Sequence, residues 1–261
     1  MPGNEFCDES APARPSRPPR LLPTSDAAAA YRLVNRRVDA LIRGRAEVAE
    51  LSVPACPAWT VRQTVAHLTG VAQDVVSVNV ERKGADAWTR AQVDRLGGYP
   101  VDELLERWGQ LMEMVTATLA LAPQPSACQL VFDALTHEHD IRGALGEPGS
   151  RTGDLAYQAA LGFVTTTGDE FIRQAGLPSL RLITPTLGPV QLGDPATGPA
   201  EISLEISDFE ALRALGGRRS LRQLSALPWR GDPTALLPVF TGLLPGVSDD
   251  GIRPPPDDLV E

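Results

Sequence analysis

The 261-residue chain is poor in the side chains that most often carry chemistry. It has three histidines, three cysteines and, among 24 basic residues, a single lysine, Lys83. Cys7, Cys56 and Cys128 form no CxxC pair, and an odd number of cysteines cannot make a complete disulfide framework. These counts exclude a zinc site built from cysteines alone and favour a reduced, cytoplasmic protein.

Clusters of basic residues and long apolar runs are also missing. The 33 acidic and 24 basic residues give a formal net charge of −9. A surface that follows phosphates needs clustered Lys and Arg, so this composition excludes broad binding to nucleic acid or anionic membranes. No apolar run approaches the ~20 residues of a membrane span, and the N-terminus lacks a signal-peptide pattern. We therefore expect a soluble protein.

Both ends of the chain are predicted to lack a fold of their own. Residues 1–23 are rich in proline and are typical of a disordered leader. Residues 246–261 form an acidic, proline-containing tail that is predicted to be loose. The fold is expected between them.

Apolar spacing predicts four helices in the first half. One starts near residue 25, and a second follows Thr60, whose spacing to Gln63 is that of a capping box. A third follows the apolar stripe over Val101–Leu119, and a fourth is expected over Ser126–Leu145, because Gly146 suits a helix end. None can bury its stripe alone, so the four most simply form a four-helix bundle over 24–150.

The second half, residues 151–245, is predicted to be a smaller α+β domain, which makes the whole chain α+β. Its expected elements are a helix at Asp154–Gln174, two strands within 180–194, one strand within 200–207, and helices at Asp208–Leu215 and Pro233–Leu244.

All three histidines fall within the predicted bundle. Asp133, His137 and Asp140 are spaced by four and three residues, so they project along one stripe of a helix. A carboxylate and an imidazole one turn apart can share a metal ion, and His67 on a facing helix would complete a set with open positions. The same spacing is equally typical of a surface ion pair near a core histidine, so the residues alone leave both interpretations open.

Five other residues receive a structural interpretation. Glu138 and His139 project away from that stripe and are predicted to form a solvated face. Cys56, between prolines, is predicted to be a small buried residue at the start of a helix rather than a nucleophile. Trp59 and Trp108 are expected in the core.

Three stretches together resemble the mycothiol-dependent maleylpyruvate isomerase family. They are VPACPAWTVRQTVAHLTG, FDALTHEHDIRGALGEPG, and DFEALRALGGRRS with GDP after Trp229. The resemblance covers residues 24–245 and implies a DinB-like metal-binding bundle followed by the family's C-terminal domain. It implies that His67, Asp133 and His137 hold a divalent metal, usually zinc, with Asp133 where the family has glutamate. Asp140 would support the site without ligating the metal.

The resemblance also implies mycothiol, the low-molecular-weight thiol of actinobacteria, as cosubstrate. A thiol on Zn²⁺ should lose its proton at neutral pH, and the thiolate is the reactive form. We expect an enzyme for cis–trans isomerisation or thiol transfer on a small electrophile, for which a dicarboxylate such as maleylpyruvate is one candidate. Arg218 is the expected catalytic arginine that binds a carboxylate; the alternative is that Arg218 and Arg219 only solvate a helix end.

Two other function classes stay open. The same three ligands would serve a zinc-dependent hydrolase, in which water replaces the thiol. The bundle and the α+β domain would also suit a non-enzymatic metal- or lipid-binding regulatory protein. The sequence indicates no oligomeric state.

Overall fold

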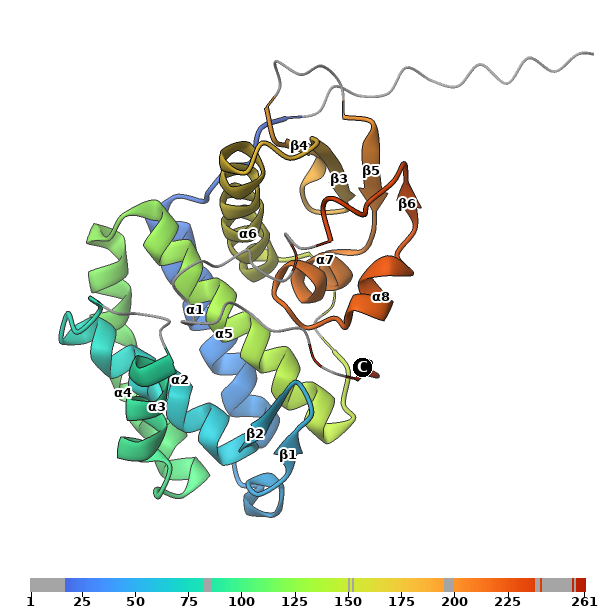
Figure 1. Ribbon diagram of the computed structural model, residues 1–261. Helices are drawn as coiled ribbons and strands as arrows, with labels where there is room; N and C mark the ends of the chain where they lie inside the picture. Colours follow the sequence, from blue (N-terminus) through green and yellow to red (C-terminus); the bar gives the residue numbers. More distant parts are fainter. Residues whose placement is uncertain are drawn as a thin grey trace, which may run out of the picture.

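The computed structural model describes residues 17–81, 86–149, 151, 153–194, 200–237, 240, 255 and 257–261. Its N-terminal part is a helical bundle, as the apolar spacing predicts, and the fold is α+β (Figure 1). A short helix that the spacing did not predict, α3, packs on α2. The bundle helices are α1 (Thr24–Ile42), α2 (Val61–Val76), α3 (Asp86–Leu96), α4 (Val101–Leu121) and α5 (Gln124–Leu145).

Local signals mark the ends of the two helices that matter most for the site. The Thr60 side chain accepts from the Gln63 backbone N–H while the Gln63 side chain accepts from Thr60, so the predicted capping box starts α2. Gly146 ends α5 with φ 64°, a left-handed conformation that glycine adopts without strain. A two-stranded hairpin of β1 (Ser52–Val53) and β2 (Cys56–Thr60), preceded by a short 3-10 turn, leads directly into α2.

The C-terminal part is a four-stranded sheet in the order β4-β3-β5-β6, with helices beside it. Neighbouring strands β3 and β4 pair antiparallel as the predicted hairpin, β3 and β5 pair parallel, and β5 and β6 pair antiparallel. Half of the predicted helix at 233–244 lies outside the described residues. The elements are α6 (Leu155–Gln174), β3 (Leu180–Thr184), β4 (Gly188–Leu192), β5 (Ile202–Glu205), α7 (Asp208–Leu215), α8 (Leu221–Ser225) and β6 (Trp229–Arg230).

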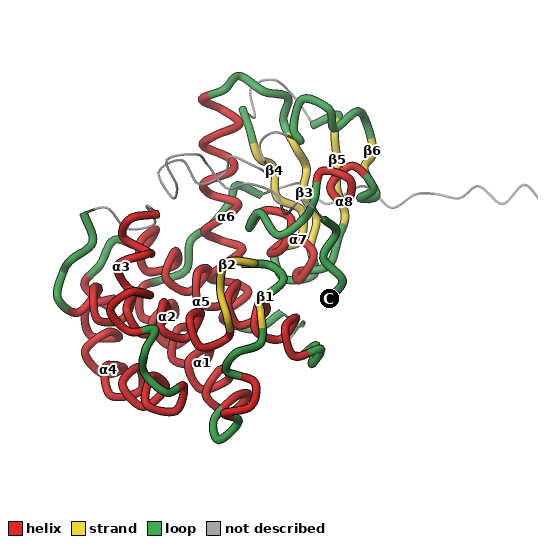
Figure 2. Tube along the Cα trace, turned by 60° about the horizontal axis from the view of Figure 1, so that its bottom comes forward, coloured by secondary structure: helices red, strands yellow, loops and turns green. Residues whose placement is uncertain are grey.

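Helix α6 connects the two parts of the molecule. It packs against α1 and α5 on one side and against α7 and β4 on the other, and Figures 1 and 2 both show it between the bundle and the sheet. The buried apolar residues form one cluster that runs through both parts. The division into 24–150 and 151–245 therefore stays a prediction about sequence organisation, because the hydrophobic core does not divide there. None of the helices in the described part of the chain is long and apolar enough to cross a membrane.

Both ends differ from the sequence-based expectation where the structure describes them. Arg17 forms a parallel bridge with Val190, which extends the sheet next to β4, so the predicted leader is not loose from residue 17 onward. In the predicted loose tail, Gln223 donates to the Leu259 carbonyl at 2.9 Å, and Glu261 binds two arginines of the C-terminal part. Composition misjudged both ends because these contacts are made with distant residues.

The predicted solvated face of α5 is also wrong. Glu138 is 0% exposed and His139 is 2% exposed, because α1 and α6 both pack on α5. Glu138 accepts from Arg37 Nε at 2.9 Å and from Arg142 Nε at 3.0 Å. His139 Nε2 lies 2.8 Å from the Tyr157 hydroxyl. Both groups are thus buried and hydrogen-bonded.

Buried His139 should make stability depend on pH. Burial, and then the charges of Arg213 and Arg142, lower the pKa of His139 to about 3. An unfolded histidine has a pKa of about 6.5. Between these pH values, His139 binds a proton in the unfolded chain but not in the folded one. The stability that neutral His139 contributes to the folded state is therefore fully present above pH 6.5 and is lost as the pH falls.

We predict that His139→Gln makes the unfolding free energy fall less steeply with falling pH between about pH 6.5 and 4.5. The reduction in slope should correspond to roughly one proton fewer taken up on unfolding. Urea unfolding at stepped pH measures this slope. The comparison has its internal control above pH 7, where His139 is neutral in both states and the two slopes should agree. Equal slopes below pH 6.5 would contradict the assignment.

Candidate metal centre

The three predicted ligands lie together in the bundle, with His67 on α2 and the other two on α5. His67 Nε2 lies 3.5 Å from Asp133 Oδ1, and His137 Nε2 lies 3.7 Å from the same oxygen. These contacts are too long for hydrogen bonds. Donor atoms about 3.3 Å apart are what a tetrahedral ion with bonds of 2.0–2.1 Å requires. The three side chains therefore have the spacing of ligands to one ion.

Each histidine has an oxygen close to its other ring nitrogen, in a hydrogen bond for His67 and in an ion-pair contact for His137. His67 Nδ1 lies 2.8 Å from Gln92 Oε1, and His137 Nδ1 lies 2.9 Å from Asp140 Oδ2. With oxygens at these positions, the tautomer that carries its proton on Nδ1 would leave each Nε2 lone pair free toward Asp133. Metal-binding histidines are held in this way.

Asp133 supplies a carboxylate with unused capacity. Its Oδ2 is buried and has no hydrogen-bond partner among the described residues. Burial by itself would raise the pKa of Asp133, but His67, His137 and Arg218 outweigh it and lower the pKa. An ionised carboxylate with an orphaned oxygen fits a divalent cation.

Gln92 is a site residue that sequence reasoning missed. It lies on α3, is fully buried, and its Nε2 donates to Asp74 Oδ2 at 2.7 Å, which turns its oxygen toward His67. Helix α3 reaches this position because Gly70 faces it: a Cβ on Gly70 would lie 2.6 Å from Gln92 Cβ. Gly70, which follows the AHL segment, was the sequence signal for a close approach of another helix to α2. The sequence does not show which helix approaches.

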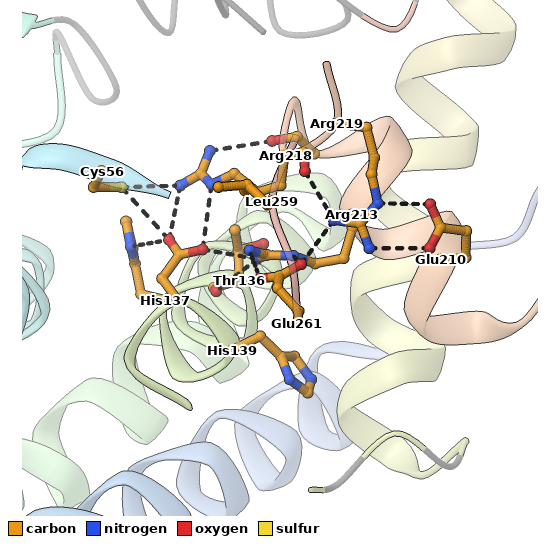
Figure 3. A network of polar contacts seen from close by, with 12 residues as sticks. Cys56, Thr136, His137, His139, Glu210, Arg213, Arg218, Arg219, Leu259 and Glu261 are labelled. Carbon is orange, nitrogen blue, oxygen red and sulfur yellow. Dashed lines mark hydrogen bonds and ion pairs between the residues drawn. The ribbon is translucent and has the colours of Figure 1, made fainter. Parts of the chain in front are cut away.

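Asp140 connects the centre to the C-terminal part. It is fully buried, accepts from Arg213 Nη1 at 2.7 Å and Arg218 Nη2 at 3.0 Å, and is in ion-pair contact with His137 (Figure 3). Burial would raise the pKa of Asp140, but Arg218 and Arg213 hold it well below its usual range. The carboxylate stays ionised beside the imidazole.

The two neighbouring arginines point in different directions (Figure 3). Arg218 faces the centre and lies 3.6 Å from Cys56 Sγ. Arg219 binds Glu210 and Glu261 and lies over the Phe209 ring. Only Arg218 of this pair could meet a molecule at the metal centre.

Cys56 lies beside the centre but has the properties of a thiol that is not activated. Burial, and then the charge of Asp140, raise its pKa to about 12. Cys56, His137 and Asp140 form a second group with metal-ligand spacing. Arg213 and Arg218 already neutralise Asp140 there, so a cation would meet two positive charges. The group of His67, Asp133 and His137 is the better metal site.

The two tryptophans differ in their environments. Trp108 is fully buried and donates to the Tyr31 hydroxyl at 3.0 Å, as a core residue should. Trp59 is half-buried, and its ring centroid lies 5.1 Å from that of His67 and 5.7 Å from that of His137. The expectation of a core role is therefore wrong for Trp59, which covers the two histidines from β2.

The fold includes a helical bundle with a two-histidine, one-carboxylate group whose spacing could hold a metal ion. Residues 31–147 match the family model of the mycothiol maleylpyruvate isomerase N-terminal domain. None of the curated proteins compared with the chain matches it.

Two crystal structures of mycothiol-dependent maleylpyruvate isomerase, one a histidine-to-alanine mutant, are also similar. Each has 14% sequence identity and a TM-score of 0.45, over 74% of this chain and 88% of the other. A similarity at this level carries no argument about the site.

The Gly70 contact predicts a change in metal affinity. Gly70→Ala should push α3 away, release His67 from Gln92, and weaken Zn²⁺ binding by about ten- to a hundredfold. Gly109→Ala is the matched control, since nothing lies within 4 Å of a Cβ there. It should leave affinity unchanged and stabilise the fold by about 0.4–1 kcal/mol. Competition with a chromogenic chelator measures affinity, and wild-type affinity in Gly70→Ala would contradict the role of the contact.

Proposed function

We propose that the protein is a divalent-metal, mycothiol-using enzyme that acts in cis–trans isomerisation or thiol transfer on a small electrophile. The observation that carries this proposal is the convergence of two oriented histidine Nε2 atoms on Asp133. The family of residues 31–147 supports the choice of thiol and of reaction.

The residues of the chain would divide the work as follows. His67, Asp133 and His137 would hold the ion, which we propose to be Zn²⁺. A divalent ion there would lower the pKa of a bound thiol, so that thiolate is present near neutral pH. Gln92 and Asp140 would keep the imidazoles in the tautomer that presents Nε2. Trp59 would limit the access of water from the β2 side.

Arg218 is the proposed catalytic residue. Its side chain is 17% exposed, and it lies on the Asp140 side of the centre. A guanidinium in this place would bind a carboxylate of the substrate or an oxyanion that forms during the reaction.

Metal content tests the ligand set. Purified wild-type protein should contain stoichiometric divalent metal, and Asp133→Asn should lose most of it because the amide lacks the charge that the cation needs. Asp94→Asn, at an exposed position of α3, is the control and should keep the metal. Elemental analysis gives the content, with circular dichroism to confirm folding. A metal-free wild type that also fails to bind added Zn²⁺ would refute the proposed centre.

Activity with and without thiol separates an isomerase or transferase from a hydrolase. Turnover of maleylpyruvate by the metal-loaded protein should require mycothiol. Turnover of a hydrolysable substrate without thiol would instead favour the zinc-dependent hydrolase.

The two arginines give an internal comparison. Arg218→Lys should lower kcat/KM by about ten- to a hundredfold at unchanged metal content, because the charge-assisted, two-pronged contact is lost. Arg219→Lys should stay within about threefold of wild type, since Arg219 points to Glu210. Equal effects would remove the catalytic assignment of Arg218. Steady-state kinetics, with metal analysis of each variant, makes the measurement.

A further inference from the structure

A cavity of about 380 Å³ adjoins the metal centre at Asp133. It lies between the second half of α2, the end of α4 and the first half of α5, with α3 beside it. Its volume is within the range of small-molecule sites, about 300–1,000 Å³. Most of its lining is apolar, including Val71, Val75, Trp88, Leu119, Leu130 and Phe132.

The charge of the lining selects the kind of group that fits. Asp133 is the only charged residue among the described residues that line the cavity, and none of them carries a positive charge. A carboxylate in this cavity would lose water and find no positively charged residue in the described lining. An uncharged apolar group would instead gain from leaving water. The cavity is thus a poor site for either end of a dicarboxylate.

The rim of the cavity carries two further signs of a binding site. Val78 is 70% exposed and Leu121 is 90% exposed, so two large apolar side chains face solvent beside the opening. Val78 also has φ 58°, a strained conformation for a β-branched residue. Two hydrogen bonds of Asn79 stabilise the strained turn. The Asn79 backbone N–H donates to the Asp74 carbonyl at 2.8 Å, and the Asn79 carbonyl accepts from Trp88 Nε1 at 2.9 Å. Strain of this kind is typical of functional segments.

The order of residues along α5 shows on which side of the metal centre the cavity lies. Gln129, Leu130 and Asp133 line the cavity, whereas Asp140, which binds Arg218, lies about 10 Å further along the helix at 1.5 Å per residue. Asp133 borders the cavity, and His137 lies between Asp133 and Asp140. The apolar cavity and Arg218 are therefore on opposite sides of the metal centre along α5.

We propose that this cavity binds the uncharged, apolar tail, alkyl or aryl, of the substrate, while the polar head of the same molecule reaches the metal centre and Arg218. The assignment of the head rests on the proposed function. The assignment of the tail rests on the cavity alone, so the two can be tested apart.

Binding of unreactive alcohols tests the cavity. Straight-chain 1-alkanols from butanol to decanol would be titrated calorimetrically into the full-length protein, once loaded with Zn²⁺ and once after chelation. The dissociation constant should fall by about fourfold per added methylene until the cavity is full, in both metal states. Suberate, a dicarboxylate as long as octanol, should bind at least about tenfold more weakly than octanol to the chelated protein.

Two neighbouring valines on α2 provide a matched pair of variants. Val75 lines the cavity and Val76 does not, and both are half-buried. Val75→Trp should fill the space and raise the octanol dissociation constant by at least about tenfold, because most of the methylenes would stay in water. Val76→Trp carries the same change of side chain and should bind octanol like wild type, with circular dichroism confirming that both are folded.

The outcomes separate this proposal from the function proposed above. Equal octanol binding by the two variants, an affinity that does not depend on chain length, or tighter binding of suberate than of octanol would overturn the apolar tail site. A protein that binds no metal but shows the expected alkanol series would refute the metal enzyme and leave the tail site standing.

Discussion

The buried carboxylate of Asp140 is the group on which the arrangement of the centre depends. An ion without water must be paired on all sides or it destabilises the fold. Asp140 meets this requirement with three partners from different parts of the chain: His137 on its own helix, Arg213 on α7, and Arg218 just after α7. The carboxylate that pairs with arginines of the C-terminal part is therefore the same carboxylate that lies 2.9 Å from Nδ1 of a proposed metal ligand.

The second histidine is held independently, from the opposite side of the bundle. Asp74 orients Gln92, and Gln92 orients His67, so this hydrogen-bond chain lies entirely within α2 and α3. It requires the close approach that Gly70 allows. Neither chain needs a bound ion to form. The histidines are thus oriented in advance, which reduces the ordering that metal binding would otherwise have to impose.

The sequence predicted correctly those features that depend on residues a few positions apart. The capping box at Thr60, the stop at Gly146 and the one-turn spacing of Asp133 and His137 are local, and the structure has all of them. Helix α3 was not predicted, because its buried residues are only Gln92, Val93 and Leu96 and these form almost no apolar stripe.

Other features depend on contacts with distant residues. Periodicity gives the direction of His139 relative to His137, but it does not show that Tyr157 of α6 lies in that direction. Trp59 was assigned to the core by its size, whereas the hairpin places it over the histidine rings. The acidic tail looked loose because its partners, Arg213 and Arg219, are more than forty positions away.

Charge is distributed unevenly around the centre, and this bears on which molecules it can accept. Acidic residues outnumber basic ones in the chain, and Arg218, the arginine that faces the centre, is already paired with Asp140. The cavity on the other side of Asp133 has no described cation at all. A molecule that used both sides would therefore be polar at one end only. Because the cavity lies within residues 71–133, inside the segment that matches the family model, while Arg218 lies outside it, the two ends of such a molecule would be selected by separate parts of the chain.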